Sequence, residues 1–169
     1  MAKNVGNSLE SKNQTHVNWE ELEYLTAKLS KIIQTNIKPD FILCIGRGGW
    51  VFGRILSSIL VVPLATILTR HYKNMGNRGK FYIDKNIVSP KPLKGTVIIV
   101  DDVVHTGKTM EEVLKVVKKK RNIKKIFTAA LYYNKEESKF APDMFVNEFR
   151  KGEWVVFPYE KEAYEGVEF

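Results

Sequence analysis

Two adjacent carboxylates followed by a short polar turn are the residues of this chain best suited to chemistry. Asp101 and Asp102 follow the apolar run 97–100, and the turn after them contains His105, Thr106, Gly107, Lys108 and Thr109. Carboxylates can hold sugar hydroxyls or a divalent cation. Backbone N–H groups and hydroxyls at a helix start can bind phosphate. Residues 96–110 therefore predict a site for a ligand that carries hydroxyl and phosphate groups.

The local pattern also predicts which elements position these groups. Residues 97–100 have the length and β-branched character of a strand buried on both faces. The polar turn opens a helix expected to end near residue 121. A Walker A loop is excluded because it needs Gly at the position of Asp102, and a dinucleotide fingerprint lacks its glycines. For any single residue, strand-to-helix capping is the simpler interpretation, but it does not account for the whole string.

A second candidate anion site lies earlier in the chain. Gly46, Arg47, Gly48 and Gly49 separate a predicted strand at 41–45 from an apolar helix expected at 50–61. Glycines let backbone N–H groups approach an anion closely, and a guanidinium can pair with it. The competing interpretation is a tight turn with an incidental arginine.

The string VIIV-DD-VV-H-TG-K-T resembles the phosphoribosyl-pyrophosphate (PRPP) signature of the type I phosphoribosyltransferases: four apolar residues, two acids, two apolar residues, any residue, then Thr-Gly-x-Thr. Arg-Gly-Gly and the later Trp-x-x-x-Pro-aromatic-acid string make the xanthine–guanine and archaeal purine enzymes the most similar members. The resemblance covers about residues 38–160. It implies an α/β fold with a mostly parallel twisted sheet flanked by helices, and a small hood formed by a long loop and a C-terminal segment.

The resemblance also implies a reaction and a set of site residues. A purine nitrogen would attack PRPP and release pyrophosphate, giving a nucleoside monophosphate for purine salvage. Asp101, Asp102 and His105 would be catalytic, and both aspartates would hold Mg²⁺ through PRPP. The 5′-phosphate would contact His105, Thr106, Gly107, Lys108 and Thr109. Pyrophosphate would contact Arg47, Gly48 and Gly49; the base would contact Lys135, Trp154, Val155 and Glu160; and the hood loop would supply Tyr72, Lys73 and Lys80.

One position departs from the family pattern. Most 6-oxopurine enzymes carry an aspartate before Thr-Gly, facing N7 of the purine, and this chain carries His105. A neutral imidazole can accept a proton from N7, although an imidazole can also donate and so select a different base. The alternative is that His105 only caps a helix.

The domain organisation is simple. We expect residues 1–17 to be a disordered tail and 18–169 to be one domain, with the hood formed by about 70–95 and 150–160. Asn18 followed by Glu21 predicts a helix over 19–36. Further strands are expected at 63–69 and 123–133, a short hairpin at 81–83, and an edge strand within 152–160.

Composition limits the other possibilities. The chain has 169 residues, a net charge of +8 and one cysteine, Cys44, which excludes internal disulfides and favours a reducing cytoplasm. The longest apolar stretch, 55–68, is too short to span a membrane. Much of the charge lies at 118–121 and 124–125, where we favour a solvated helix end over a nucleic-acid site. The resemblance implies a homo-oligomer, a dimer or tetramer.

Two alternatives to a purine enzyme stay open at this stage. One is a non-catalytic regulatory protein that senses PRPP or nucleotide with the same signature. The other is a phosphoribosyltransferase for a different base, such as orotate, which the aromatic segment around Trp154 disfavours.

Overall fold

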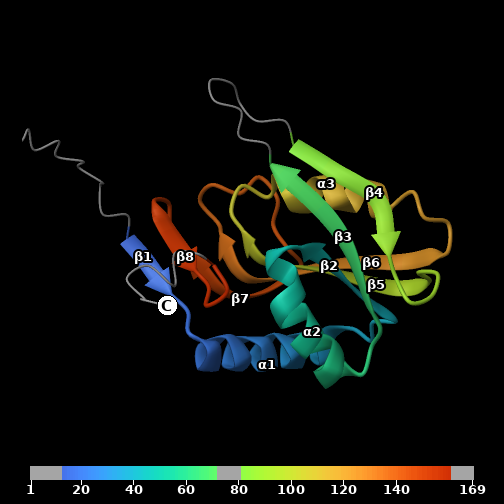
Figure 1. Ribbon diagram of the computed structural model, residues 1–169, viewed down its shortest axis with the longest axis horizontal. Helices are drawn as coiled ribbons and strands as arrows, with labels where there is room; N and C mark the ends of the chain where they lie inside the picture. Colours follow the sequence, from blue (N-terminus) through green and yellow to red (C-terminus); the bar gives the residue numbers. More distant parts are fainter. Residues whose placement is uncertain (1–12, 72–80, 161–169) are drawn as a thin grey trace, which may run out of the picture.

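The central sheet has six strands in the order β4-β3-β2-β5-β6-β7, and every neighbouring pair is parallel except β3 and β4. A computed structural model describes residues 13–71 and 81–160 (Figure 1). The strands of this sheet are β2 (Phe41–Gly46), β3 (Leu64–His71), β4 (Phe81–Val88), β5 (Gly95–Val104), β6 (Ile123–Asn134) and β7 (Met144–Phe149). The mostly parallel α/β fold is confirmed.

Helices cover both faces of the sheet, as a parallel sheet requires. Helices α1 (Trp19–Asn36) and α2 (Gly48–Leu60) lie on one face, and α3 (Lys108–Val117) lies on the other (Figure 1). The predicted cap of α1 is confirmed, because the Asn18 side chain accepts a hydrogen bond from the Glu21 backbone N–H at 2.8 Å. Two apolar layers result, one on each face of the sheet.

Residues 13–16, which were expected to be disordered, form a strand. Strand β1 (Asn13–His16) pairs in parallel with β8 (Glu153–Val156), and the two form a separate small sheet. The expectation of disorder up to residue 17 is therefore wrong for 13–17, and residues 1–12 lie outside the described part of the chain. The cause is long-range pairing, which a polar local sequence does not reveal.

Several element boundaries also differ from the sequence-based prediction. Strand β5 continues past the acids to Val104, and α3 ends at Val117 rather than near 121. Strand β4 is longer than the predicted hairpin at 81–83. Strand β7 was not predicted, because its sequence, MFVNEF, carries no strong strand signal of its own. The helix predicted at 50–61 begins two residues earlier, so the glycine pair lies inside its first turn.

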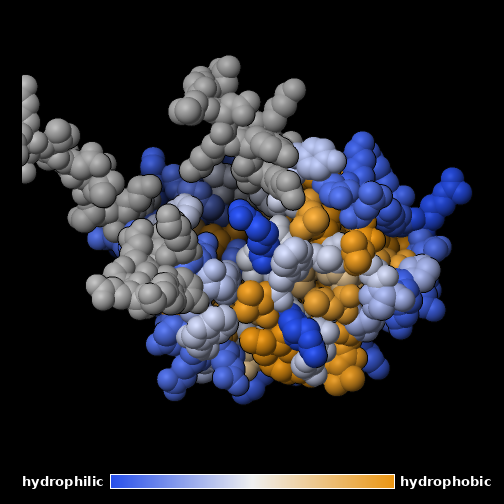
Figure 2. Space-filling view, in the orientation of Figure 1, coloured by the Kyte–Doolittle hydropathy of each residue, from blue (hydrophilic) through white to orange (hydrophobic). Residues whose placement is uncertain are grey.

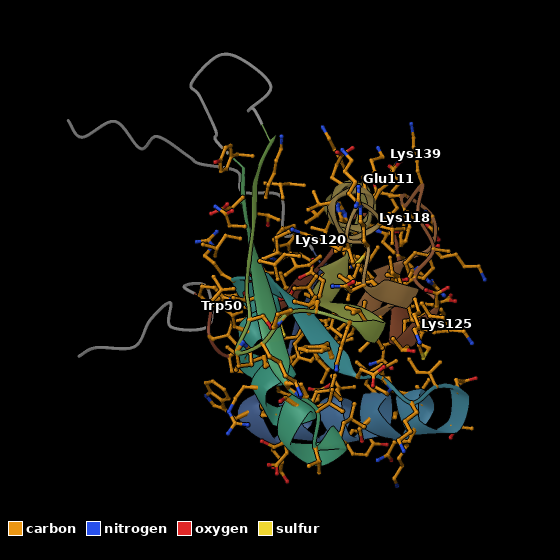
Figure 3. All side chains as sticks on the ribbon, turned by 90° about the vertical axis from the view of Figure 1, so that its right-hand side faces the viewer. Trp50, Glu111, Lys118, Lys120, Lys125 and Lys139 are labelled. Carbon is orange, nitrogen blue, oxygen red and sulfur yellow. The ribbon has the colours of Figure 1, made fainter. Side chains whose placement is uncertain are left out.

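The basic run after α3 faces solvent. Residues 118–121 and 124–125 are all exposed, and Figure 3 shows Lys118 and Lys125 among the outer side chains. This agrees with a solvated helix end. In the part of the chain that the structure describes, no helix combines the length and the apolar character needed to cross a bilayer.

A glycine lets α2 lie directly against β2. A Cβ added at Gly53 would overlap the Cys44 sulfur, and Cys44 is fully buried. Burial raises the pKa of the Cys44 thiol to about 12, so this cysteine is an inert packing residue.

We expect Gly53→Ala to destabilise the fold by roughly 1–3 kcal/mol, because the overpacking exceeds the gain in helix propensity of at most about 1 kcal/mol. Urea unfolding would measure the change. In a Cys44→Ala background the same substitution should cost much less, because the sulfur that it meets is gone. Equal costs in the two backgrounds would show that Cys44 is not the limiting contact.

Candidate active site

The two acids lie side by side near the carboxyl end of β5, a central strand of the sheet. The Asp102 N–H donates to Asp101 Oδ1 at 3.1 Å, and the Val103 N–H donates to Asp102 Oδ1 at 2.8 Å. Burial raises the pKa of Asp101 well above its ordinary value, and the neighbouring charge of Asp102 adds to this. Burial also raises the pKa of Asp102, although its hydrogen bonds oppose the effect.

Tyr159 holds the second acid from the C-terminal segment. Its hydroxyl donates to Asp102 Oδ2 at 2.8 Å, and its ring stacks on Phe157 with centroids 5.4 Å apart. This hydrogen bond is the largest of the contributions that lower the pKa of Asp102. Tyr159 was not predicted as a site residue, although it lies within the aromatic string around Trp154.

The glycine loop is shaped by the same acids. A Cβ on Gly48 would overlap Asp102 Oδ2, and one on Gly49 would lie 3.0 Å from the Val100 carbonyl oxygen. Only residues without a side chain let the start of α2 approach β5 this closely. The loop at 46–49, which includes Arg47, therefore packs directly against the strand that carries the two acids.

A cavity of about 510 Å³ lies over the start of α3 and connects these elements. Gly107 is the N-cap residue of α3 with φ of +78°, and as a glycine it has no side chain to cap the helix. The helix N-terminus is thus open to an anion. The cavity is lined by Arg47, Asp101, Val103, Val104, His105, Thr106, Gly107, Lys108, Thr109, Met110 and Trp154.

A smaller cavity of about 240 Å³ adjoins the first. It is lined by Asp102, Val103, His105, Phe149, Trp154, Val155 and Glu160. Val103, His105 and Trp154 line both cavities, so the two meet at these residues. The larger cavity is lined by the cations Arg47 and Lys108 and by the start of α3, and the smaller one by the aromatic rings of Phe149 and Trp154. This combination suits a ligand that has an anionic part and a flat heterocycle.

His105 lies at this junction in a defined position. Its Nε2 is 2.9 Å from Glu137 Oε2, its ring stacks on Phe149 with centroids 5.8 Å apart, and its ring meets Trp154 edge-on at 6.3 Å. Because Gly107 is the N-cap, His105 does not cap α3. Neither Glu137 nor Phe149 was predicted. Phe149 ends β7, a strand that was not expected, whereas Glu137 lies in the turn after the expected strand at 123–133 and carried no signal of its own.

The remaining predicted residues fall into three groups. Val155 and Glu160 line the smaller cavity as expected, and a Glu160 carboxylate oxygen accepts the Phe157 N–H at 2.9 Å. Lys135 is among the residues that line neither of these two cavities; its ammonium lies 3.6 Å from Glu148 and its side chain is 69% exposed. Tyr72, Lys73 and Lys80 lie outside the described residues.

The donor set limits how a metal could bind. Within residues 13–71 and 81–160, no group of three or more His, Cys, Asp or Glu side chains could enclose a metal ion. Asp101 lines the larger cavity and Asp102 lines the smaller one, and both offer carboxylate oxygens. Mg²⁺ commonly takes one or two protein carboxylates and completes its shell with substrate phosphates and water, so this pair fits a substrate-borne Mg²⁺.

Comparison with known proteins agrees with this geometry. A purine phosphoribosyltransferase from Pyrococcus horikoshii Ot3 is 34% identical, with 88% of this chain and 95% of that chain covered and a TM-score of 0.74. A xanthine-guanine phosphoribosyltransferase of Idiomarina loihiensis is 26% identical over 151 residues, 89% of each chain. The Helicobacter pylori xanthine-guanine-hypoxanthine phosphoribosyltransferase shares the fold at 24% identity, with 89% and 97% coverage and a TM-score of 0.74.

The family model described as "Phosphoribosyl transferase domain" matches residues 18–164, which include every element of the two cavities. The match and the 34% identical relative together cover the signature strand, the glycine loop and the aromatic segment. This chain therefore belongs to the phosphoribosyltransferase family, and it is an enzyme of that family.

Proposed function

We propose that this enzyme transfers the phosphoribosyl group of PRPP to a purine base, xanthine, guanine or hypoxanthine, and releases pyrophosphate in purine salvage. The observation that carries the proposal is the junction of the two cavities at His105 and Trp154. The larger cavity matches the phosphorylated sugar and the smaller one matches the base, so the anomeric carbon and the attacking nitrogen would meet between them.

Each group of residues would contact a different part of PRPP. Amides and hydroxyls of the turn at 105–109 bind the 5′-phosphate at the start of α3. Asp101 and Asp102 accept hydrogen bonds from the ribose hydroxyls and balance the positive charge that develops on the sugar as pyrophosphate leaves. Arg47 and the glycine loop receive the pyrophosphate. This assignment is supported by the lining of the larger cavity and by the contact of Gly48 with Asp102.

The base is held in the smaller cavity. Trp154 frames or stacks on the purine, and Val155 and Glu160 complete the wall. Lys135 is proposed only as a residue that reaches the base after movement, because in this conformation its ammonium faces Glu148. Mg²⁺ bound with PRPP would be held by Asp101 and Asp102, and it would offset charge on the pyrophosphate leaving group.

The alternative of a non-catalytic PRPP sensor is not favoured. The glycine loop, the acid pair and the aromatic pocket are all assembled in the order that the transfer needs. The relatives described above are named as enzymes that act on purines. A preference for a base other than a 6-oxopurine remains a variant of the same function, decided by the smaller cavity.

We also propose that the enzyme is a homo-oligomer of the cytoplasm. Hydrophobic residues gather over the α2 side of the molecule in Figure 2, where Trp50, Ile59 and Val61 are exposed. Trp50, labelled in Figure 3, donates to Thr66 of β3, and Thr66 pairs with the exposed Val88. This apolar surface supports association of two copies, and the free buried Cys44 supports a reducing compartment.

The direct test is a transfer assay with purified protein, Mg²⁺, PRPP and a panel of purine and pyrimidine bases, following pyrophosphate release. We expect turnover with at least one 6-oxopurine and much less with orotate or uracil. Measurable PRPP binding without turnover on any base would overturn the enzyme proposal in favour of a sensor.

Replacing Trp154 should separate base binding from PRPP binding. We expect Trp154→Ala to raise the KM for the purine roughly 10-fold or more, since stacking on one base contributes about 1–3 kcal/mol, while the KM for PRPP changes little. Trp154→Phe should keep most of the affinity. The exposed aromatic Tyr24 on α1 provides the matched control, and equal effects of Trp154→Ala and Tyr24→Ala would contradict the stacking role.

We expect the ionised acid pair to lower the free energy of unfolding of the ligand-free enzyme. Because the folded pKa of Asp101 lies above its unfolded value, the folded state binds more protons than the unfolded state over that range. The free energy of unfolding therefore falls as pH rises from about 4 through the raised folded pKa. Asp101→Asn removes the buried charge and keeps an acceptor for the Asp102 N–H.

We therefore expect Asp101→Asn to raise the melting temperature at pH 7, by roughly 2–4 °C for each kcal/mol gained, and to lower transfer activity strongly. Thermal unfolding between pH 4 and 8 would measure this difference, which should shrink toward pH 4. A variant that is less stable than the parent at pH 7 would contradict the predicted electrostatic cost.

A further inference from the structure

The carboxylate of Glu137 defines the chemistry of His105. Glu137 lies in the turn after β6, and its Oε2 atom is 2.9 Å from His105 Nε2. Phe149 covers one face of the imidazole at 5.8 Å, and Trp154 meets its edge at 6.3 Å. The ring is thus held by a carboxylate hydrogen-bond partner and two aromatic neighbours, and it lines both cavities.

Glu137 is itself held by a buried amide. Asn134 Oδ1 accepts the backbone N–H groups of Glu136 at 3.1 Å and of Glu137 at 3.0 Å. These two donors identify the amide oxygen, so the Asn134 Nδ2 group faces Glu137 Oε2 at 3.0 Å. Asn134 is fully buried. The side chains form a relay from the end of β6, through Glu137, to His105.

The relay determines which imidazole nitrogen faces the substrate. An ionised carboxylate only accepts hydrogen bonds, so Nε2 carries the hydrogen and Nδ1 of the neutral ring is left as the acceptor. The other charged residues that line these cavities, among the described part of the chain, are Asp102 and Glu160 in the smaller cavity, and Arg47, Asp101 and Lys108 in the larger one. Among these groups, Glu137 is the one whose carboxylate is in direct contact with the ring.

We propose that Glu137 is a positioning residue that fixes His105 as the proton acceptor for N7 of the purine. The inference rests on the proposed function. As the base N9 lone pair forms the bond to the anomeric carbon, the bond from that carbon to pyrophosphate oxygen breaks and pyrophosphate leaves with the electron pair. The N7 proton moves to His105 Nδ1. The imidazolium that forms is stabilised by the Glu137 carboxylate, as in other carboxylate–histidine pairs.

The test compares Glu137→Gln with Glu136→Gln, a neighbouring substitution that removes the same charge. In Glu137→Gln the amide oxygen can take the place of Oε2 between Asn134 Nδ2 and His105 Nε2, so the imidazole keeps its tautomer but loses the negative charge that stabilises the imidazolium. We expect kcat for a 6-oxopurine to fall roughly 100-fold, in the range ascribed to general acid–base catalysis, with the KM for PRPP nearly unchanged. Glu136→Gln should stay within about 3-fold of the parent enzyme by the same principle.

Two further measurements separate positioning from a general structural effect. Nitrogen-15 NMR of the histidine ring should show hydrogen on Nε2 in the parent enzyme and in Glu137→Gln, and a mixture of the two tautomers in Glu137→Leu, which removes the acceptor. In a His105→Asp background, whose carboxylate accepts the proton directly, Glu137→Gln should cost no activity.

The outcomes distinguish this inference from the function on which it rests. No turnover by the parent enzyme on any purine would overturn the proposed function and the acceptor role together. Turnover that Glu137→Gln leaves at the level of Glu136→Gln, or an imidazole hydrogen found on Nδ1 in the parent enzyme, would overturn only the role of Glu137. An equal loss of activity in the parent and His105→Asp backgrounds would also reject it, because the effect would then not pass through His105.

Discussion

The structure depends on the placement of two adjacent carboxylates, Asp101 and Asp102, inside a parallel sheet. Burial and mutual repulsion disfavour their ionised forms. Backbone N–H groups and the Tyr159 hydroxyl offset part of this cost. The partners proposed for this pair, namely ribose hydroxyls and the positive charge of Mg²⁺ and of the reacting sugar, would offset the rest. Such strain is tolerated at functional sites because ligand binding relieves it.

The acid pair also explains features elsewhere in the fold. The glycine loop lies where any side chain at Gly48 would occupy the position of Asp102 Oδ2. The C-terminal segment returns across the sheet to bring Tyr159 to the same carboxylate, and the small β1–β8 sheet anchors that segment. Elements that are more than fifty residues apart in sequence therefore meet at one carboxylate.

Features that depend on neighbours in the chain could be predicted from the sequence. The strand–turn–helix of the PRPP signature, the Asn18 cap and the glycine loop each follow from a few adjacent residues. Features set by strand pairing could not be predicted, because β1 and β7 carry little strand signal and owe their structure to partners far away in sequence. Phe149, at the end of β7, could not be assigned to the site for the same reason.

The prediction that Lys135 contacts the base is sensitive to a shift of a single residue at the end of β6. Successive side chains along a strand alternate in direction, so a shift of one residue moves a group to the other face. At the end of β6 the inward position belongs to Asn134, which is buried and organises the following turn, while Lys135 is exposed beside Glu148. The polar residue at this strand end thus supports His105 instead of the base directly.

Glu137 explains why this chain can carry His105 where most 6-oxopurine enzymes carry an aspartate. An aspartate at this position would add a carboxylate to a region that already contains Asp102, Glu137 and Glu160. Like charges at short range in a partly enclosed site repel strongly. The imidazole instead places a neutral ring between Glu137 and the base, and it becomes charged only when it takes up a proton, at which point the carboxylate stabilises it. His105 and Glu137 are therefore best understood as a pair, in which the acceptor faces the substrate and the negative charge is kept one ring further away.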